Sequence, residues 1–176
     1  FFTEVNPTNL STNTNCTIPW IVQENSNDIC CCVDNIIPTD KSKAAFTSFD
    51  SNQDNTIYTI EQTITIPNTI INTAELSFDW VANFDLTFGA ILKRDFTVTL
   101  TTLSDEIIST LYNYEIAPNE RTSVNENVNI DISSIISSRA GENLKLKFSA
   151  FIPERSTGPA KSLIDNVSLT VSSLTN

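Results

Sequence analysis

The chain has 176 residues, of which 10 are basic, 21 are acidic and none is histidine, and its formal net charge is -11. This length suits a single domain with a substantial buried core. An acidic chain without basic clusters is poorly suited to bind nucleic acid or an anionic membrane, and no apolar run approaches the roughly 20 residues of a membrane span. The lack of histidine excludes Ser-His and Cys-His catalysis and histidine-ligated metal sites.

The first 35 residues differ from the rest of the chain. They contain every cysteine and show little regular alternation of apolar and polar residues. A segment of this length is too short to bury its own core. We therefore predict an N-terminal arm or stapled lobe over residues 1–35 and a β-sandwich domain over residues 36–176. Because the sequence begins at Phe1 with no signal peptide, we interpret it as the mature form of a secreted precursor, located outside the cell.

The cysteines are Cys16 and the consecutive Cys30, Cys31 and Cys32. Their spacing fits no zinc motif, and an even number of cysteines in a secreted chain indicates disulfides. A bond from Cys16 to the triplet would close a loop of about 15 residues and contribute roughly 3 kcal/mol. The other two cysteines then form a strained pair, stay free, or bond to another copy of the chain.

From about residue 44 the sequence alternates between apolar and polar residues, as strands with one buried face do in antiparallel sheets. Trp80 alternates with Phe78 and Phe84, so we expect it in the core. The alternating runs are 58–66, 76–84, 96–100, 128–132, 144–148 and 166–171. These short strands predict an all-β fold, an antiparallel β-sandwich of the jelly-roll type, preceded by the irregular disulfide-bearing arm.

Turn signals separate the predicted strands. They are Asp50–Asn52, Pro67–Asn68, Pro118–Asn119, Ala140–Gly141 and Thr157–Pro159. The segment Ile132–Arg139 predicts a single helical turn, with Gly141 just beyond it as a C-cap. Tight hairpin turns favour glycine, although asparagine can also take positive φ. Because the chain has only three glycines, we expect longer loops and crossovers between the sheets.

Five segments of the chain carry a resemblance to a known class. They are Ile18-Pro19-Trp20, the polar loop 39–46, the strand Leu76–Trp80, the stretch 131–136 and the closing strand Ile164–Leu169. Together they resemble the secreted jelly-roll modules of the galactose-binding-like class, which includes carbohydrate-binding modules and MAM-type domains. The resemblance covers about residues 18–171 and is far more specific for fold than for function. The cysteine triplet is not part of that class pattern.

The resemblance implies a structural calcium ion. Its ligands would be Asp165, just before the last strand, and the main-chain carbonyl of Lys43, with Asp40 or Glu4 as helpers. Calcium takes six to eight oxygen ligands, and carboxylates and carbonyls are suitable donors. The alternative is that Asp165 only ends a strand. The oxygen-rich run 50–55 lacks the glycine and glutamate of an EF-hand loop and indicates a solvated turn.

Aromatic side chains that stack on sugar rings are the candidates for ligand binding. Trp80 is expected in the core, so Trp20, Tyr112 and Tyr114 are the better candidates for exposed rings. The alternative for Tyr112 and Tyr114 is that two tyrosines two residues apart are ordinary members of one strand face. Candidate glycosylation sites are the sequons at Asn9, Asn15 and Asn166.

No catalytic motif is present, so we expect no enzyme activity. There is no nucleophile elbow, P-loop or dinucleotide fingerprint, and the acidic residues lie in no recognisable motif. The main hypothesis is an extracellular structural subunit that self-assembles into a fibre, coat or surface layer through its arm and intersubunit disulfides. The alternative is an adhesion module that binds a carbohydrate or surface ligand and carries calcium. The expected partners are therefore other copies of the chain or a glycan, with no nucleic acid and no membrane insertion.

Overall fold

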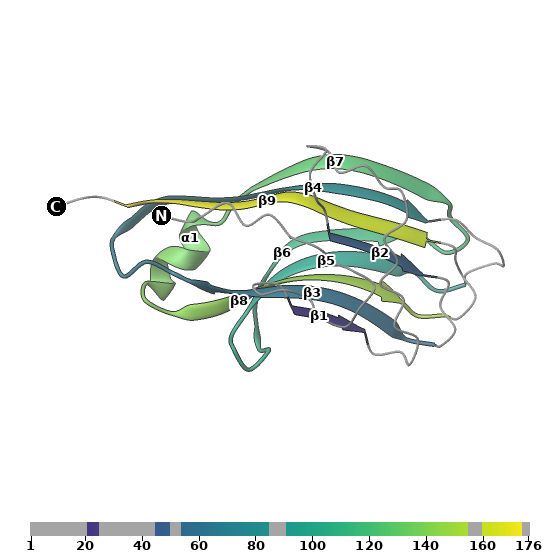
Figure 1. Ribbon diagram of the computed structural model, residues 1–176, viewed down its shortest axis with the longest axis horizontal. Helices are drawn as coiled ribbons and strands as arrows, with labels where there is room; N and C mark the ends of the chain where they lie inside the picture. The colour runs from purple at the N-terminus through teal and green to yellow at the C-terminus, as the bar shows by residue number, and fades with distance from the viewer. Residues whose placement is uncertain (1–20, 25–44, 50–53, 85–90, 155–159, 174–176) are drawn as a thin grey trace.

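The computed structural model of the protein describes residues 21–24, 45–49, 54–84, 91–154 and 160–173. These residues form two antiparallel β-sheets packed face to face, with a short helix at one end (Figure 1). The five-stranded sheet has the order β1 (Ile21–Glu24), β3 (Thr56–Thr65), β8 (Asn143–Ile152), β5 (Arg94–Thr101), β6 (Ile107–Ile116). The four-stranded sheet has the order β2 (Ala45–Phe49), β9 (Ala160–Ser173), β4 (Ile71–Phe84), β7 (Thr122–Asp131).

The order of the strands confirms the predicted jelly roll. Strands β2-β9-β4-β7 form one sheet and β3-β8-β5-β6 the body of the other, so that most connections cross between the sheets. Strand β1 lies within the predicted arm of residues 1–35, yet it pairs with β3 as an edge of the five-stranded sheet. Part of that segment therefore belongs to the sandwich, and the domain boundary at residue 35 stays a prediction.

The core lies between the two sheets and is built from the inward side chains that the alternation predicted. Trp80 of β4 is fully buried, and its ring stacks on Phe96 of β5 with centroids 4.3 Å apart. The indole N–H of Trp80 donates a hydrogen bond to Ser162 Oγ at 2.9 Å. The tryptophan therefore joins the two sheets without leaving a buried polar group unsatisfied.

One end of the sandwich is closed by the predicted helical turn. It is present as α1 (Ser133–Ile136) and the following 3-10 turn η1 (Ser137–Arg139). Gly141 follows with φ of 81°, a conformation that strains other residues, and its N–H donates to the Ile66 carbonyl at 3.1 Å. No helix within the described ranges is long and apolar enough to cross a membrane.

Asparagine fills several positions with positive φ, where glycine is often found. Among the described residues, the non-glycine residues with positive φ are Asn55, Asp105, Asn119 and Asn166. Asparagine and aspartate tolerate this region better than other side chains. Asp105 lies in the turn between β5 and β6, and its side chain reaches the outer face of the five-stranded sheet.

Candidate functional site

The outer face of the five-stranded sheet carries a continuous row of polar side chains. Strand register places four residues side by side across β3, β8, β5 and β6, and we call them the polar row: Thr59, Ser149, Thr97 and Asn113. Neighbouring strands lie about 4.8 Å apart, so the row spans roughly 14 Å. Each of these four strands contributes one hydroxyl or amide group to the row.

An aromatic ring lies next to the polar row. Phe151 of β8 is half-buried on the outer face, and its register partner Ile57 of β3 is 40% exposed. On the other side of Phe151 lies Asp95, whose pKa is raised mainly by burial. Lys93 and Glu115 form an ion pair at the same end of the face. This end therefore combines an apolar surface with charged groups at its margin.

Four charged side chains lie on the opposite side of the polar row, and we call them the ion-pair cluster: Glu61, Asp105, Lys145 and Lys147. The Nζ atoms of Lys145 and Lys147 lie 3.3 and 3.4 Å from the two carboxylate oxygens of Glu61. Both Nζ atoms also contact Asp105 Oδ1, at 3.0 and 3.3 Å. The two ammonium groups are thus held between a carboxylate of the sheet and a carboxylate of a turn.

Glu61 is more deeply buried than its place in the sequence pattern predicted. The alternation placed it on the polar side of its strand, and it does lie on the outer face, but it is only 3% exposed. The two lysines converge on its carboxylate, and this pairing makes burial of the charge tolerable.

The β5–β6 turn brings Asp105 onto the face, and Figure 1 shows this connection projecting from the outer side of the five-stranded sheet. The turn closes through hydrogen bonds from Thr102 N to the Glu106 carbonyl at 2.9 Å and from Asp105 N to the Thr102 carbonyl at 3.1 Å. Asp105 has φ of 67°. Hydrogen bonds from Lys145 and Lys147 lower the pKa of Asp105. The turn therefore forms a wall at one end of the face.

The tyrosines that the sequence proposed as ligand-binding residues lie elsewhere. Tyr112 and Tyr114 share one face of β6, as predicted, but they are half-buried on its inner side. Their rings make edge contacts with Trp80 at centroid distances of 6.0 and 5.1 Å. The Tyr112 hydroxyl donates to Glu126 Oε2 at 2.5 Å, and burial raises its pKa above the usual range. The expectation of exposed rings was therefore wrong, because β6 turns these two residues toward the core, and their role in ligand binding stays a prediction. Trp20 lies outside the described residues.

The calcium prediction finds one of its ligands in the described part of the chain. Asp165 is fully buried at a β-bulge of β9, where its carboxylate accepts a hydrogen bond from the Asn166 N–H at 2.8 Å. A buried carboxylate suits a cation ligand. The other predicted ligand, the carbonyl of Lys43, and the helpers Asp40 and Glu4 lie outside the described residues. Within the described residues, no group of three or more Cys, Asp or Glu side chains could hold a metal.

Of the predicted modification sites, only Asn166 lies in the described ranges. Its side chain is half-buried, its φ is 50°, and its amide donates to Asp79 Oδ2 at 2.7 Å. Glycosylation there stays a prediction. Asn9, Asn15 and all four cysteines, Cys16, Cys30, Cys31 and Cys32, lie outside the described residues.

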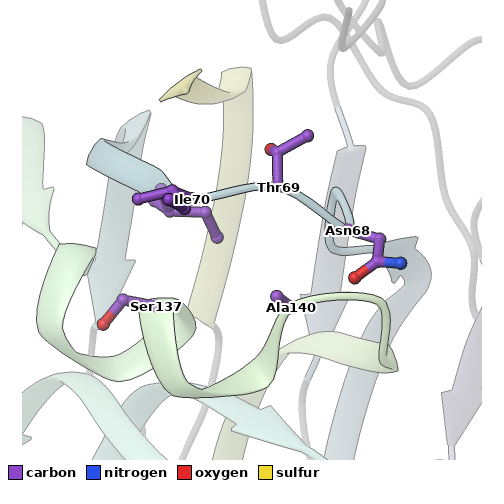
Figure 2. A pocket seen from close by; sticks show the side chains of 6 residues that line it. Asn68, Thr69, Ile70, Ser137 and Ala140 are labelled. Atoms are coloured by element: carbon purple, nitrogen blue, oxygen red, sulfur yellow. The ribbon is translucent and has the colours of Figure 1, made fainter. Parts of the chain in front are cut away.

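A pocket of about 440 Å³ lies at the helical end of the sandwich (Figure 2). Figure 2 shows α1 and η1 on one side of it and the segment that leads into β4 on the other. The residues that line it are Asn68, Thr69, Ile70, Ile71, Ser137 and Ala140. The lining has no ionisable and no aromatic side chain, so the outer face of the five-stranded sheet offers the richer binding chemistry.

No protein-family model matches the sequence, and no curated protein matches it significantly. Among solved structures, the chain is similar to TmCBM61 in complex with β-1,4-galactotriose, at 12% identity over 88% of this chain and 90% of that one, with a TM-score of 0.47. It is also similar to the cleaved adhesin domain of Lys-gingipain from Porphyromonas gingivalis, at 13% identity over 89% and 91% of the two chains, with a TM-score of 0.49. A third is the carbohydrate-binding module CBM28, described as specific for non-crystalline cellulose, at 12% identity over 72% and 74% and a TM-score of 0.42.

The resemblance seen in the sequence motifs thus has counterparts among solved structures, and two of these three are carbohydrate-binding modules. Identities of 12–13% and TM-scores below 0.5 mark a distant similarity. Neither the ligands nor the roles of these proteins extend to this chain on that basis. Evidence for a function therefore has to come from the residues of the outer face itself.

Proposed function

We propose that the chain is an extracellular, non-catalytic module that binds a glycan on the outer face of its five-stranded sheet. The observation that carries this proposal is the polar row lying directly beside the half-buried ring of Phe151. A sugar ring presents hydroxyl groups around its rim and C–H groups on its faces. It can therefore place an apolar face on Phe151 and its hydroxyls on the polar row.

The charge of this face supports a glycan as the ligand. Its acidic groups are Glu61, Asp95, Asp105 and Glu115, and three lysines of the face lie close to them, in ion pairs with Glu61, Asp105 and Glu115. A face of nearly balanced charge neither attracts nor repels a neutral polar ligand strongly. Binding of the neutral parts of a glycan would thus depend on hydrogen bonds and apolar contact.

The outer face of the four-stranded sheet is a weaker candidate. Strands β4 and β7 turn carboxylates, amides, small hydroxyls and Val81 outward, and no aromatic side chain. At its centre, Asp79 accepts hydrogen bonds from the side chains of Asn127 at 2.6 Å and Asn166 at 2.7 Å. These groups already satisfy one another, so this face supplies the control positions for binding experiments.

Loss of one hydroxyl of the polar row should weaken glycan binding. Thr97→Val keeps the shape of the side chain, and removing one well-placed hydrogen bond is expected to lower affinity about 3- to 10-fold. Phe151→Ala should lower it further, because the apolar platform is removed. Binding would be measured by calorimetry with a hit from a glycan array.

The matched control is Thr170→Val, which makes the same change at an outward position of β9 on the other sheet. It should leave affinity unchanged. Equal affinity of the wild type, Thr97→Val and Phe151→Ala would remove the glycan site from the five-stranded face. The absence of any glycan ligand would reject the proposed function.

We further propose that the module contains a structural calcium ion with Asp165 as a ligand, and the full burial of this carboxylate supports the proposal. Calcium in excess over its dissociation constant should raise the midpoint of thermal unfolding, and EDTA should lower it. Asp165→Asn should abolish the difference between the two conditions. A midpoint that is the same with calcium and with EDTA would reject the site.

A second candidate function is a self-associating structural subunit, and the observation that favours it is the cysteine triplet Cys30–Cys32. An internal bond to Cys16 would use only one member of the triplet. The long strand edges of the described region do not support assembly by strand addition. Strand β6 has two register shifts against β5, and β7 turns the charged Glu126 inward toward Tyr112. Bulges and inward charges are features that discourage pairing of edges. Covalent linkage through the cysteines is therefore the form of assembly that we propose.

Intersubunit disulfides would be visible by gel electrophoresis of protein from its native source. A ladder that collapses on reduction to a band near the chain mass of 19.5 kDa is expected if the chains are linked. A single monomer band with and without reductant would exclude covalent assembly. Glycan binding would then remain as the candidate function.

A further inference from the structure

The two lysines of the ion-pair cluster share a carboxylate that belongs to a surface turn. Lys145 and Lys147 project from the same side of β8, and both contact Oδ1 of Asp105. Their side chains are only 15% and 22% exposed. Ammonium groups that are partly removed from water interact more strongly with an anion than exposed ones do. The pair therefore forms a preorganised anion site on the candidate binding face.

The two carboxylates that occupy this site are held very differently. Glu61 belongs to the sheet, and its side chain is 4% exposed. Asp105 belongs to the β5–β6 turn, and its side chain is 53% exposed. Its φ of 67° is an uncommon conformation that persists only while the surroundings hold it. Exposed ion pairs contribute little to stability, so Asp105 can leave the lysines at small cost, whereas Glu61 cannot.

The groups around the lysines suit a sugar that carries an anion. Register places Thr99 beside Lys147 and Thr101 beside Lys145 on the neighbouring strand β5. The polar row lies two residues further along the strands, about 7 Å away. Without Asp105, the two lysines and Glu61 would leave one net positive charge at the end of a hydroxyl-lined face.

We propose that this face takes an acidic glycan, whose sugar carboxylate replaces Asp105 between Lys145 and Lys147. This inference depends on the proposed glycan-binding function and names the class of glycan. Asp105 is then an internal stand-in for the ligand carboxylate and a competitor of it. The remaining sugar hydroxyls would lie along the polar row, with the ring of Phe151 beyond it.

The test uses two pairs of probes that differ in charge on one scaffold. Oligogalacturonate is compared with its methyl-esterified form, and sialyllactose is compared with lactose, by calorimetry at low salt. At least one acidic probe should bind the wild type at least 10-fold more tightly than its neutral counterpart does. Which of the two acidic probes binds distinguishes a uronate from a sialate ligand. Added NaCl should weaken this binding.

Two variants should change the affinity in opposite directions, which a purely structural role of the cluster would not do. Asp105→Asn removes the competitor and should bind the acidic probe several-fold tighter. Lys147→Gln should bind it at least 10-fold more weakly. The matched control is Arg121→Gln, which removes one positive charge at an exposed position just before β7 of the other sheet, and it should leave affinity unchanged. Circular dichroism would establish that each variant is folded.

Neutral probes that bind as tightly as acidic ones, or an Asp105→Asn variant that binds no tighter than the wild type, would overturn the inference. If neutral glycans bind the polar row and acidic ones do not, the acidic specificity fails and the proposed function stands. If no glycan binds the protein at all, the proposed function fails as well.

Discussion

Replacement of Trp80 by alanine should lower the free energy of unfolding by about 3–5 kcal/mol, the range seen when a large buried aromatic side chain is removed. The ring is fully buried and stacks on Phe96 at 4.3 Å, and its N–H is bonded to Ser162. Because a domain of this size is stabilised by only about 5–15 kcal/mol, the variant would be close to unfolding at ambient temperature. Urea titration followed by far-ultraviolet circular dichroism would measure the change.

Trp80→Phe is the control for this prediction. It keeps an aromatic contact with Phe96 and loses the indole hydrogen bond and part of the volume, so its cost should be clearly smaller than that of the alanine variant. A loss below about 1 kcal/mol for Trp80→Ala would mean that this ring does not join the two sheets as described.

The second large effect is expected at Glu61, on the outer face. Removing one partner of a buried ion pair costs about 3–5 kcal/mol because the other charge stays behind without compensation. Lys145 and Lys147 keep part of their exposure to water, at 15% and 22%, and can still contact Asp105. We therefore expect Glu61→Ala to cost less, about 2–3 kcal/mol, measured by urea titration.

The comparison variant is Glu115→Ala, which breaks the ion pair with Lys93 at the exposed end of the same face. The side chains of that pair are 57% and 49% exposed, so its loss should hardly change stability. Equal effects of the two alanine variants would show that the burial of Glu61 has no energetic consequence.

Much of the fold was predictable because the signal lies in single strands. Alternation of Leu76, Phe78 and Trp80 specifies which side of β4 is buried, whatever strand lies next to it. The helical turn near residue 133 was predictable for the same reason, because caps and turns depend on local residues. Strand β1 was missed, since four residues flanked by irregular sequence give no periodicity to read.

The candidate site was not predictable, because it depends on register. Lys145 and Lys147 were visible as the polar side of their strand, and so was Thr97 on another. Nothing in the sequence says that Thr97 lies beside Ser149, or that Glu61 lies beside Lys147; the pairing of β3, β8 and β5 decides this. The prediction for the two tyrosines failed for a different reason. The alternation placed them correctly on one face of β6, but only the packing against Trp80 shows that this is the inner face.

The position of β9 in the sheet has a consequence for folding while the chain is being synthesised. This strand lies between β2 and β4, although it follows both of them in the chain, and Ala45 pairs with Ile164. During synthesis from the amino end, the four-stranded sheet therefore lacks one of its two central strands until nearly all of the described chain has been made. Until then the apolar face of β4 has no completed sheet around it and is open to wrong partners. A nascent chain of this topology needs either protection from other chains or rapid closure once β9 arrives.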